Sequence, residues 1–132
     1  MTSPRPDSLN HADAITRHLA TSLADLPHRP RWVDGSGLSR YNLITPRSLI
    51  SLLLKIQTRV PLARLQRLLP EVQPSVWAKS GSMSGVYNLS GYLRTRRGRW
   101  LAFSIMHNGF TRPVSAVRTE TLRWLEQLYK SF

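Results

Sequence analysis

The fold is indicated most directly by residues 86–107, Val-Tyr-Asn-Leu-Ser-Gly-Tyr-Leu-Arg-Thr-Arg-Arg-Gly-Arg-Trp-Leu-Ala-Phe-Ser-Ile-Met-His. An alternation with a period of two, as in this stretch, is typical of a strand with one buried face. The Arg-Arg-Gly turn between the two runs indicates an antiparallel hairpin. We therefore predict strands at 86–94 and 99–107. Their core-facing residues are Tyr87, Leu89, Gly91 and Leu93 on the first strand, and Leu101, Phe103 and Ile105 on the second.

Segments with helical spacing flank this hairpin. Apolar residues recur every three or four positions in four places, and each of these patterns is typical of an amphipathic or buried helix. Thr45 and Pro46 supply a cap and a first helical residue for the most apolar of them, which we expect to be largely buried. The order predicts an α/β (α+β) fold, with helices packed on an antiparallel sheet of about three strands and a C-terminal helix that covers it. The expected helices are 12–26, 46–59, 62–69 and 114–128, and a further extended segment is expected at 75–79.

Length and composition limit the classes of protein to which the chain can belong. Its 132 residues are enough for one domain, and a 41% hydrophobic content is typical of a globular chain. No apolar run is long enough to span a bilayer, and the polar start predicts that the chain has no signal peptide. The absence of cysteine excludes disulfides and thiol nucleophiles.

The net charge of +12 raises the possibility of a nucleic-acid ligand. The arginines are nevertheless scattered along the chain, and the single tight group, 94–99, surrounds a glycine as in a solvated turn. The four tryptophans lie on separate predicted elements and do not form a stacking platform. We therefore expect no nucleic-acid partner, although a steep dependence of binding on salt would indicate one.

Two segments contain more glycine and serine than folding alone requires. Residues 34–40, Asp-Gly-Ser-Gly-Leu-Ser-Arg, lack the third glycine of a dinucleotide loop and the Gly-Lys-Ser/Thr of a phosphate loop, so a tight turn is favoured. Residues 79–82, Lys-Ser-Gly-Ser, follow an apolar strand. An ammonium beside a hydroxyl is able to hold a carboxylate, and Gly81 lets a substrate backbone approach. A surface lysine before a turn is the plainer alternative.

Taken together, longer versions of these segments resemble one known family. Asp-Gly-Ser-Gly-Leu-Ser-Arg-Tyr-Asn-Leu-Ile-Thr-Pro-Arg at 34–47 and Ala-Lys-Ser-Gly-Ser-Met-Ser-Gly-Val-Tyr-Asn-Leu-Ser-Gly-Tyr-Leu at 78–93 are similar to the DacB-type D-alanyl-D-alanine carboxypeptidases and endopeptidases. These are class C low-molecular-mass penicillin-binding proteins. The resemblance runs from about residue 14 to 132 and implies part of a penicillin-binding, serine β-lactamase-like fold.

The resemblance also assigns roles to residues. Lys79-Ser80-Gly81 matches the family's K-T-G strand, which binds the terminal carboxylate of the peptide, with serine in place of threonine. The backbone N–H of Ser82 would form half of an oxyanion hole. The role of the other matching segment is left open. Its residues are Asp34, Gly35, Ser36, Gly37, Ser39 and Arg40.

The family's nucleophile motif, S-x-x-K, does not occur in these 132 residues. The residues three positions before the lysines are Leu52, Val76 and Gln127. We therefore expect the C-terminal part of such an enzyme, a fragment that binds stem peptides but does not hydrolyse them by itself. The alternative is a non-catalytic module that binds peptidoglycan or another carboxylate.

The remaining expectations concern organisation and partners. We expect residues 1–10 to be a flexible terminus and 11–132 to be the C-terminal part of a transpeptidase-like serine hydrolase domain. No cofactor or metal is expected, because none of the four histidines has metal-ligand spacing. The resemblance implies a peptidoglycan peptide or a β-lactam as ligand and the periplasm or cell envelope as location, whereas the missing signal peptide favours the cytoplasm. A sheet with an exposed edge predicts self-association.

Overall fold

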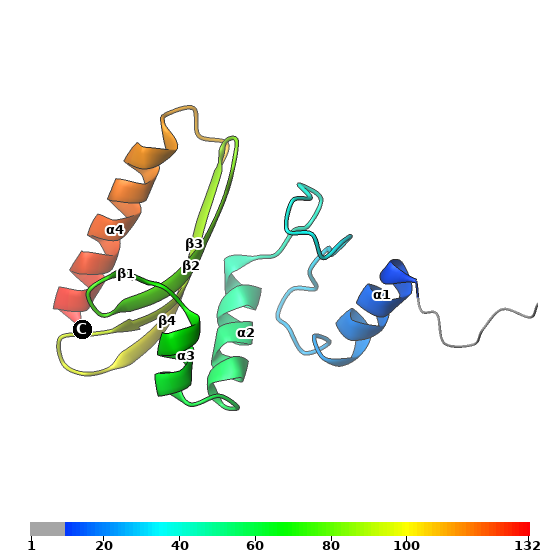
Figure 1. Cartoon of the computed structure of the whole chain (residues 1–132), viewed down its shortest axis with the longest axis horizontal. Helices are drawn as coiled ribbons and strands as arrows, with labels where there is room; N and C mark the ends of the chain where they lie inside the picture. The colour runs from blue at the N-terminus through cyan, green and yellow to red at the C-terminus, as the bar shows by residue number, and fades with distance from the viewer. Residues whose placement is uncertain (1–9) are drawn as a thin grey trace, which may run out of the picture. The chain divides into compact units, whose positions relative to one another are not determined.

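The computed structural model describes residues 10–132, so the expectation of a flexible terminus lies almost wholly outside the described residues. The chain divides into two compact units, residues 10–48 and 49–132 (Figure 1). Each unit is described by itself below.

The second unit is built on a four-stranded antiparallel sheet in the order β1-β2-β3-β4. The predicted hairpin is confirmed as β3 and β4, which pair without interruption from Val86↔Asn108 to Arg94↔Trp100. The strand expected at 75–79 continues to residue 83, and a further three-residue strand precedes it. The strands are β1 Glu71–Gln73, β2 Val76–Met83, β3 Val86–Arg94 and β4 Trp100–Asn108.

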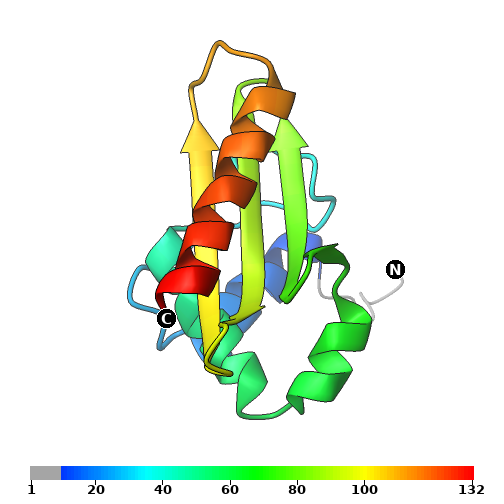
Figure 2. The same ribbon diagram turned by 90° about the vertical axis from the view of Figure 1, so that its left-hand side faces the viewer.

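Helix α4, Val114–Ser131, covers one face of this sheet (Figure 2). Its fully buried Val117 and Leu125 pack against the face of β3 that carries Leu89 and Leu93, as the alternation predicted. Gly91 lies on the same face, where β3 and β2 approach closely. A Cβ at this position would lie 2.6 Å from the Cα of Ala78. The core therefore needs a glycine here so that the two strands can pair.

The second unit also contains most of α2, Pro46–Gln57, and all of α3, Leu62–Leu68. The predicted start of α2 is confirmed, because the Thr45 hydroxyl accepts a hydrogen bond from the Ser48 N–H at 3.2 Å. The prediction that α2 is largely buried is wrong. Ser48 is its one buried residue, and the side chain of Leu54 is 48% exposed. Within residues 49–132 no element packs extensively against α2, so its apolar residues remain partly exposed.

The first unit contains α1, His11–Thr21, and the chain that leads to α2. Asn10 caps this helix by accepting a hydrogen bond from the Asp13 N–H at 2.9 Å. The helix ends five residues before the predicted residue 26, because the N–H groups of Ser22 and Leu23 both donate to the His18 carbonyl and close its last turn. The extended segment near Trp32 forms a single bridge, Arg31↔Leu43.

Candidate functional site

The four residues proposed from sequence, Lys79 to Ser82, lie in the second half of β2. One edge of this strand is fully paired with β3. On the other edge, β1 and the preceding residue cover only its first part, where the Ala78 N–H donates to the Pro70 carbonyl at 3.0 Å. Beyond Ala78, no described residue pairs with the outer edge of β2. The predicted site therefore coincides with an open strand edge.

The direction of the backbone groups along this edge follows from the pairing. In an antiparallel strand, alternate residues direct both their N–H and C=O groups to the same side. The Ala78 N–H points away from β3, so the N–H and C=O of Ser80 and Ser82 also point outward. The Ser82 N–H is thus available to an incoming acceptor, as the proposed oxyanion role requires.

The side chains of the segment alternate between the two faces of the sheet. Ser80 and Ser82 lie on the face covered by α4, and Lys79 and Gly81 lie on the opposite face. The Lys79 ammonium nevertheless bends around the edge and donates to the outward Ser80 carbonyl at 3.0 Å. A carboxylate contacted by both the ammonium and the Ser80 hydroxyl must therefore lie beside the edge itself.

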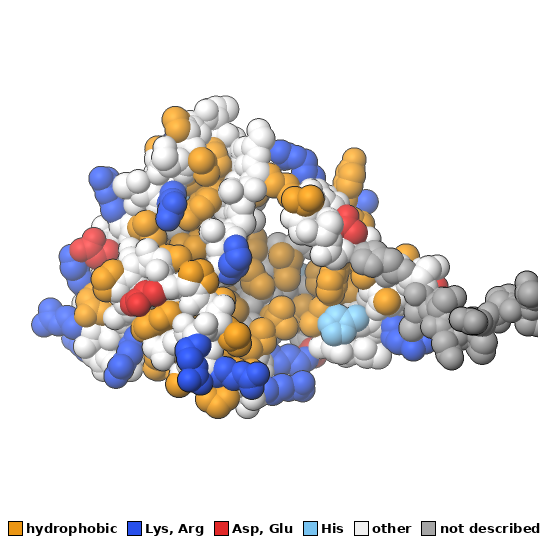
Figure 3. Space-filling view, viewed as in Figure 1, with side chains coloured by type: hydrophobic (Ala, Val, Ile, Leu, Met, Phe, Trp, Pro, Cys, Tyr) orange, Lys and Arg blue, Asp and Glu red, His pale blue; other side chains and the backbone are white. Residues whose placement is uncertain are grey.

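The electrostatics of this edge are those of an accessible cation. The Lys79 side chain is exposed, and in residues 10–132 it has no ion-pair partner. Figure 3 shows Lys and Arg side chains spread over the visible face, with few Asp or Glu among them. The net charge of +12 likewise favours an anionic ligand over a cationic one.

Gly81 is not required by the packing of this chain. A Cβ at this position would meet nothing within 4 Å, in contrast to Gly91. Its backbone φ also lies outside the positive range that favours glycine. The packing of the described residues thus leaves room for a side chain at Gly81.

Sequence reasoning missed two polar residues on the Lys79 face. Ser90 and Asn88 are the β3 partners of Lys79 and Gly81. The side-chain oxygen of Asn88 is enclosed and has no hydrogen-bond donor, whereas the Ser90 hydroxyl donates to that of Ser104 at 2.9 Å. The polar residues at alternate positions of β3 are the sequence signal that could have found them.

The other proposed segment, residues 34–40, lies in the first unit and forms a turn. The Asp34 carboxylate accepts hydrogen bonds from the N–H and the hydroxyl of Ser36, at 3.0 and 2.7 Å. The Ser36 hydroxyl accepts in turn from the Leu38 N–H at 3.1 Å, and Gly37 has a φ of 74°. Ser39 closes the turn by accepting from the Tyr41 N–H. The tight turn favoured from sequence is confirmed.

Two kinds of feature are absent from the part of the chain that the structure describes. No three His, Asp or Glu side chains between residues 10 and 132 gather into a group that would hold a metal ion. None of the helices in that range is both long and apolar enough to cross a membrane.

Comparison with known proteins connects this geometry to one family. The sequence pattern of the D-Ala-D-Ala carboxypeptidase 3 (S13) family matches residues 5–72 and 70–128. The D-alanyl-D-alanine carboxypeptidase DacB of Haemophilus influenzae is 35% identical over 95 residues, which are 59% of this chain. The D-alanyl-D-alanine carboxypeptidase of Actinomadura sp. strain R39 is 36% identical over 100 residues, or 61% of this chain.

Solved structures agree with these relatives. The crystal structure of penicillin-binding protein 4 (DacB) from Haemophilus influenzae covers 89% of the chain with a TM-score of 0.70 and 28% identity. The same protein in complex with a β-lactam superposes with a TM-score of 0.71. The chain spans about a fifth of the length of its curated relatives and 31% of the Haemophilus structure.

Proposed function

The chain belongs to the D-Ala-D-Ala carboxypeptidase 3 (S13) family, and we propose that its β2 edge binds the terminal carboxylate of a peptidoglycan stem peptide. Lys79 would supply the charge and Ser80 a directional hydrogen bond. Gly81 would leave room for the peptide, and the Ser82 N–H would hold an oxygen of the scissile carbonyl. Such a ligand would place the protein in the cell envelope.

A single observation carries this proposal. The Lys79 ammonium lies over the open edge of β2, on the outward Ser80 carbonyl, and no described acidic side chain neutralises it. An extended peptide that pairs with this edge would bring its terminal carboxylate within reach of the ammonium. Backbone pairing would supply affinity, and the charge would select the carboxyl end.

Binding of a stem peptide with a free carboxyl terminus tests the proposal. Replacing Lys79 with methionine keeps the length of the side chain and removes its charge. We expect the affinity to fall about tenfold, the size of one charge-assisted hydrogen bond. Lys130→Met is the matched control, because Lys130 is exposed on α4 and bonded to Glu126. Equal affinities for the wild type and the Lys79 variant would overturn the proposal.

These residues are proposed to bind and not to hydrolyse. Acyl transfer to serine requires a nucleophile with an adjacent base, and the sequence contains no S-x-x-K. We expect a fluorescent penicillin to bind to the chain without forming a covalent adduct. Turnover of a D-Ala-D-Ala peptide, or an adduct that survives denaturation, would show that another nucleophile acts. The second candidate is a module that binds peptidoglycan or another carboxylate and has no part in a hydrolase, and the lack of S-x-x-K in these 132 residues favours it.

Self-association through β4 is the last part of the proposal. Its outer edge pairs with no described strand, and Trp100–Asn108 contains no Lys, Arg, Asp, Glu or Pro to prevent edge-to-edge pairing. Met106→Lys places a charge on this edge, and Thr111→Lys adds the same charge in the exposed loop that follows. We expect only Met106→Lys to lower the sedimentation coefficient at high concentration. Identical sedimentation of all three proteins would contradict an interface at β4.

A further inference from the structure

A cavity of about 400 Å³ lies on the opposite face of β2 from Lys79. It opens between the sheet and the first turns of α4, entirely within the second unit. A volume of this size is within the range of small-molecule sites. Its lining is partly apolar, from Val72, Leu89, Val114 and Leu122, and partly polar, from Ser80, Ser82, Tyr87, Ser115, Arg118 and Thr119.

Tyr87 is the most informative of the polar residues. Only 5% of the residue is exposed, and burial raises the pKa of its phenol, an effect that the Arg118 guanidinium partly opposes. The phenol makes no hydrogen bond with any described residue. Among the described residues, the Asn88 oxygen is the only side-chain polar atom that is both fully enclosed and without a hydrogen-bond partner. The Tyr87 oxygen also lacks a partner, so it is not fully enclosed. Tyr87 lines the cavity, and its hydroxyl is a donor without an acceptor among the described residues.

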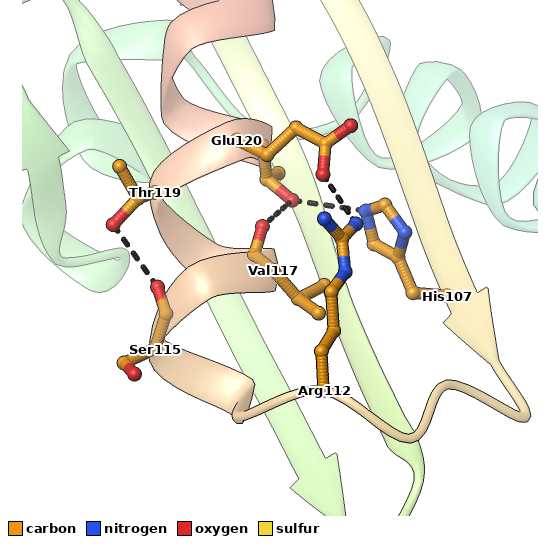
Figure 4. Close-up of polar contacts among 7 residues, drawn as sticks. His107, Arg112, Ser115, Val117, Thr119 and Glu120 are labelled. Carbon is orange, nitrogen blue, oxygen red and sulfur yellow. Dashed lines mark hydrogen bonds and ion pairs between the residues drawn. The ribbon is translucent and has the colours of Figure 1, made fainter.

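Arg118 supplies a positive charge at the rim of the same cavity. It has no ion-pair partner in the part of the chain that the structure describes. Arg112, the other arginine near the start of α4, differs in that it pairs with Glu120. Figure 4 shows this pair and His107 on one side of α4, and Ser115 and Thr119 on the other side. The arginine that lacks an ion-pair partner, Arg118, is thus the one that lines the cavity.

The start of α4 adds a third contribution. Its N-cap is Pro113, which makes no side-chain capping bond, and its first turn contains no acidic residue. The N–H groups of Val114 and Ser115 precede the first intrahelical hydrogen bond, so they lack acceptors within the helix. The positive end of the helix dipole favours an anion here. Both residues line the cavity.

We propose that this cavity is a second binding site, for a small carboxylate that carries a short apolar group. The carboxylate would lie between the Arg118 guanidinium, the Tyr87 hydroxyl and the start of α4. Its apolar group would lie against Leu89 and Leu122. The cavity shares Ser80 and Ser82 with the Lys79 edge, but its charged side chain, Arg118, lies on α4, and the proposal does not depend on the function proposed for that edge.

Titration of the full ¹⁵N-labelled chain with hexanoate tests this site. We expect saturable shifts of the Ser115 and Thr119 amides, which line the cavity and lie away from the Lys79 edge, with a dissociation constant on the order of 1 mM, as for other ligands of this size. Hexan-1-ol, which has the same chain without the charge, should bind at least about fivefold more weakly. Saturation by both at equal concentrations would overturn the proposal, as would no saturation by hexanoate.

Variants separate this cavity from the Lys79 edge. Arg118→Gln and Tyr87→Phe should each weaken hexanoate binding about three- to tenfold, because each removes one hydrogen-bond donor. Arg123→Gln removes an equal charge from an exposed position on α4 outside the cavity and should have no effect. If Arg118→Gln matches Arg123→Gln, or if Lys79→Met abolishes the shifts, the cavity is not the site.

Discussion

His107 on β4 and Thr121 on α4 share a hydrogen bond of 2.9 Å between Nε2 and Oγ1 (Figure 4). The Thr121 hydroxyl also bonds to the Val117 carbonyl at 2.9 Å, and it has a single proton to donate. A carbonyl only accepts, so this proton goes to Val117. The hydroxyl must then accept from His107, whose proton is on Nε2.

Replacing Thr121 with valine should therefore destabilise the second unit. The residue is only 2% exposed, so valine fills the same space but leaves the His107 N–H without its acceptor. We expect a loss of about 1–2 kcal/mol in the free energy of unfolding. Long-range ¹⁵N correlation spectra of the wild type should show the Nε2–H tautomer. An Nδ1–H tautomer, or a variant as stable as the wild type, would contradict the assignment.

Replacement by alanine should cost much more stability at one glycine of the paired strands, Gly91, than at another, Gly81. Gly91→Ala places a methyl group against the Trp77 carbonyl and within 2.6 Å of the Ala78 Cα, so the β2–β3 pairing must open. We expect a loss of about 3 kcal/mol or more, or no folded protein. Gly81→Ala meets no neighbour within 4 Å and should change stability by no more than about 0.5 kcal/mol. Thermal unfolding of the pair measures the difference, and equal melting temperatures would refute the close approach at Gly91.

Alkaline pH should destabilise the chain through two tyrosines. Burial raises the pKa of Tyr92 above 10.0, and burial also raises that of Tyr87. Above about pH 10 the unfolded chain loses these protons before the folded chain does, so the folded state binds more protons and stability falls as pH rises. The stabilisation is complete below pH 10 and is lost as the pH passes through the folded pKa values.

A variant that lacks both phenols separates the effect of tyrosine ionisation on stability from that of lysine ionisation. The Tyr87→Phe, Tyr92→Phe double variant cannot ionise at either position. Its free energy of unfolding should fall less steeply than that of the wild type between about pH 9 and pH 11. Denaturant unfolding at a series of pH values gives both slopes, and parallel curves would exclude the two phenols as the cause.

The elements that the sequence predicted well are those defined by local chemistry. The β3–β4 hairpin, the Thr45 cap and the Asp34 turn each depend on residues a few positions apart, and the structure confirms all three. The extent of burial was harder to predict. The apolar pattern of α2 indicated a buried helix, but burial depends on what packs against it, and little of the described chain does.

Only part of the candidate site could be predicted from local sequence. Lys79 and Ser80 are adjacent in sequence, so their proximity was certain, but the bend of the ammonium toward the Ser80 carbonyl depends on where β1 ends. The cavity beside Arg118 had no local signal at all. Tyr87 lies 31 residues before Arg118, and only the packing of α4 on the sheet brings both to one cavity.

Ser48 makes a buried set of hydrogen bonds in the first unit, and the loss of these bonds should be measurable. The side chain is fully buried, accepts from the His28 N–H at 3.0 Å and donates to the His28 carbonyl at 2.7 Å. Ser48→Ala removes both bonds and leaves two backbone groups of His28 without partners. We expect a loss of about 2 kcal/mol in stability and faster hydrogen exchange of the His28 amide.

Thr45→Ala is the comparison variant. It removes the cap of α2 and the bonds of the Thr45 hydroxyl to the His28 ring and the Ser48 hydroxyl, but it keeps both bonds between the Ser48 hydroxyl and the His28 backbone. It should therefore cost about 1 kcal/mol. Exchange of the His28 amide should then remain slow. Fast exchange in both variants would mean that the cap, and not the buried serine, holds residues 28 and 48 together.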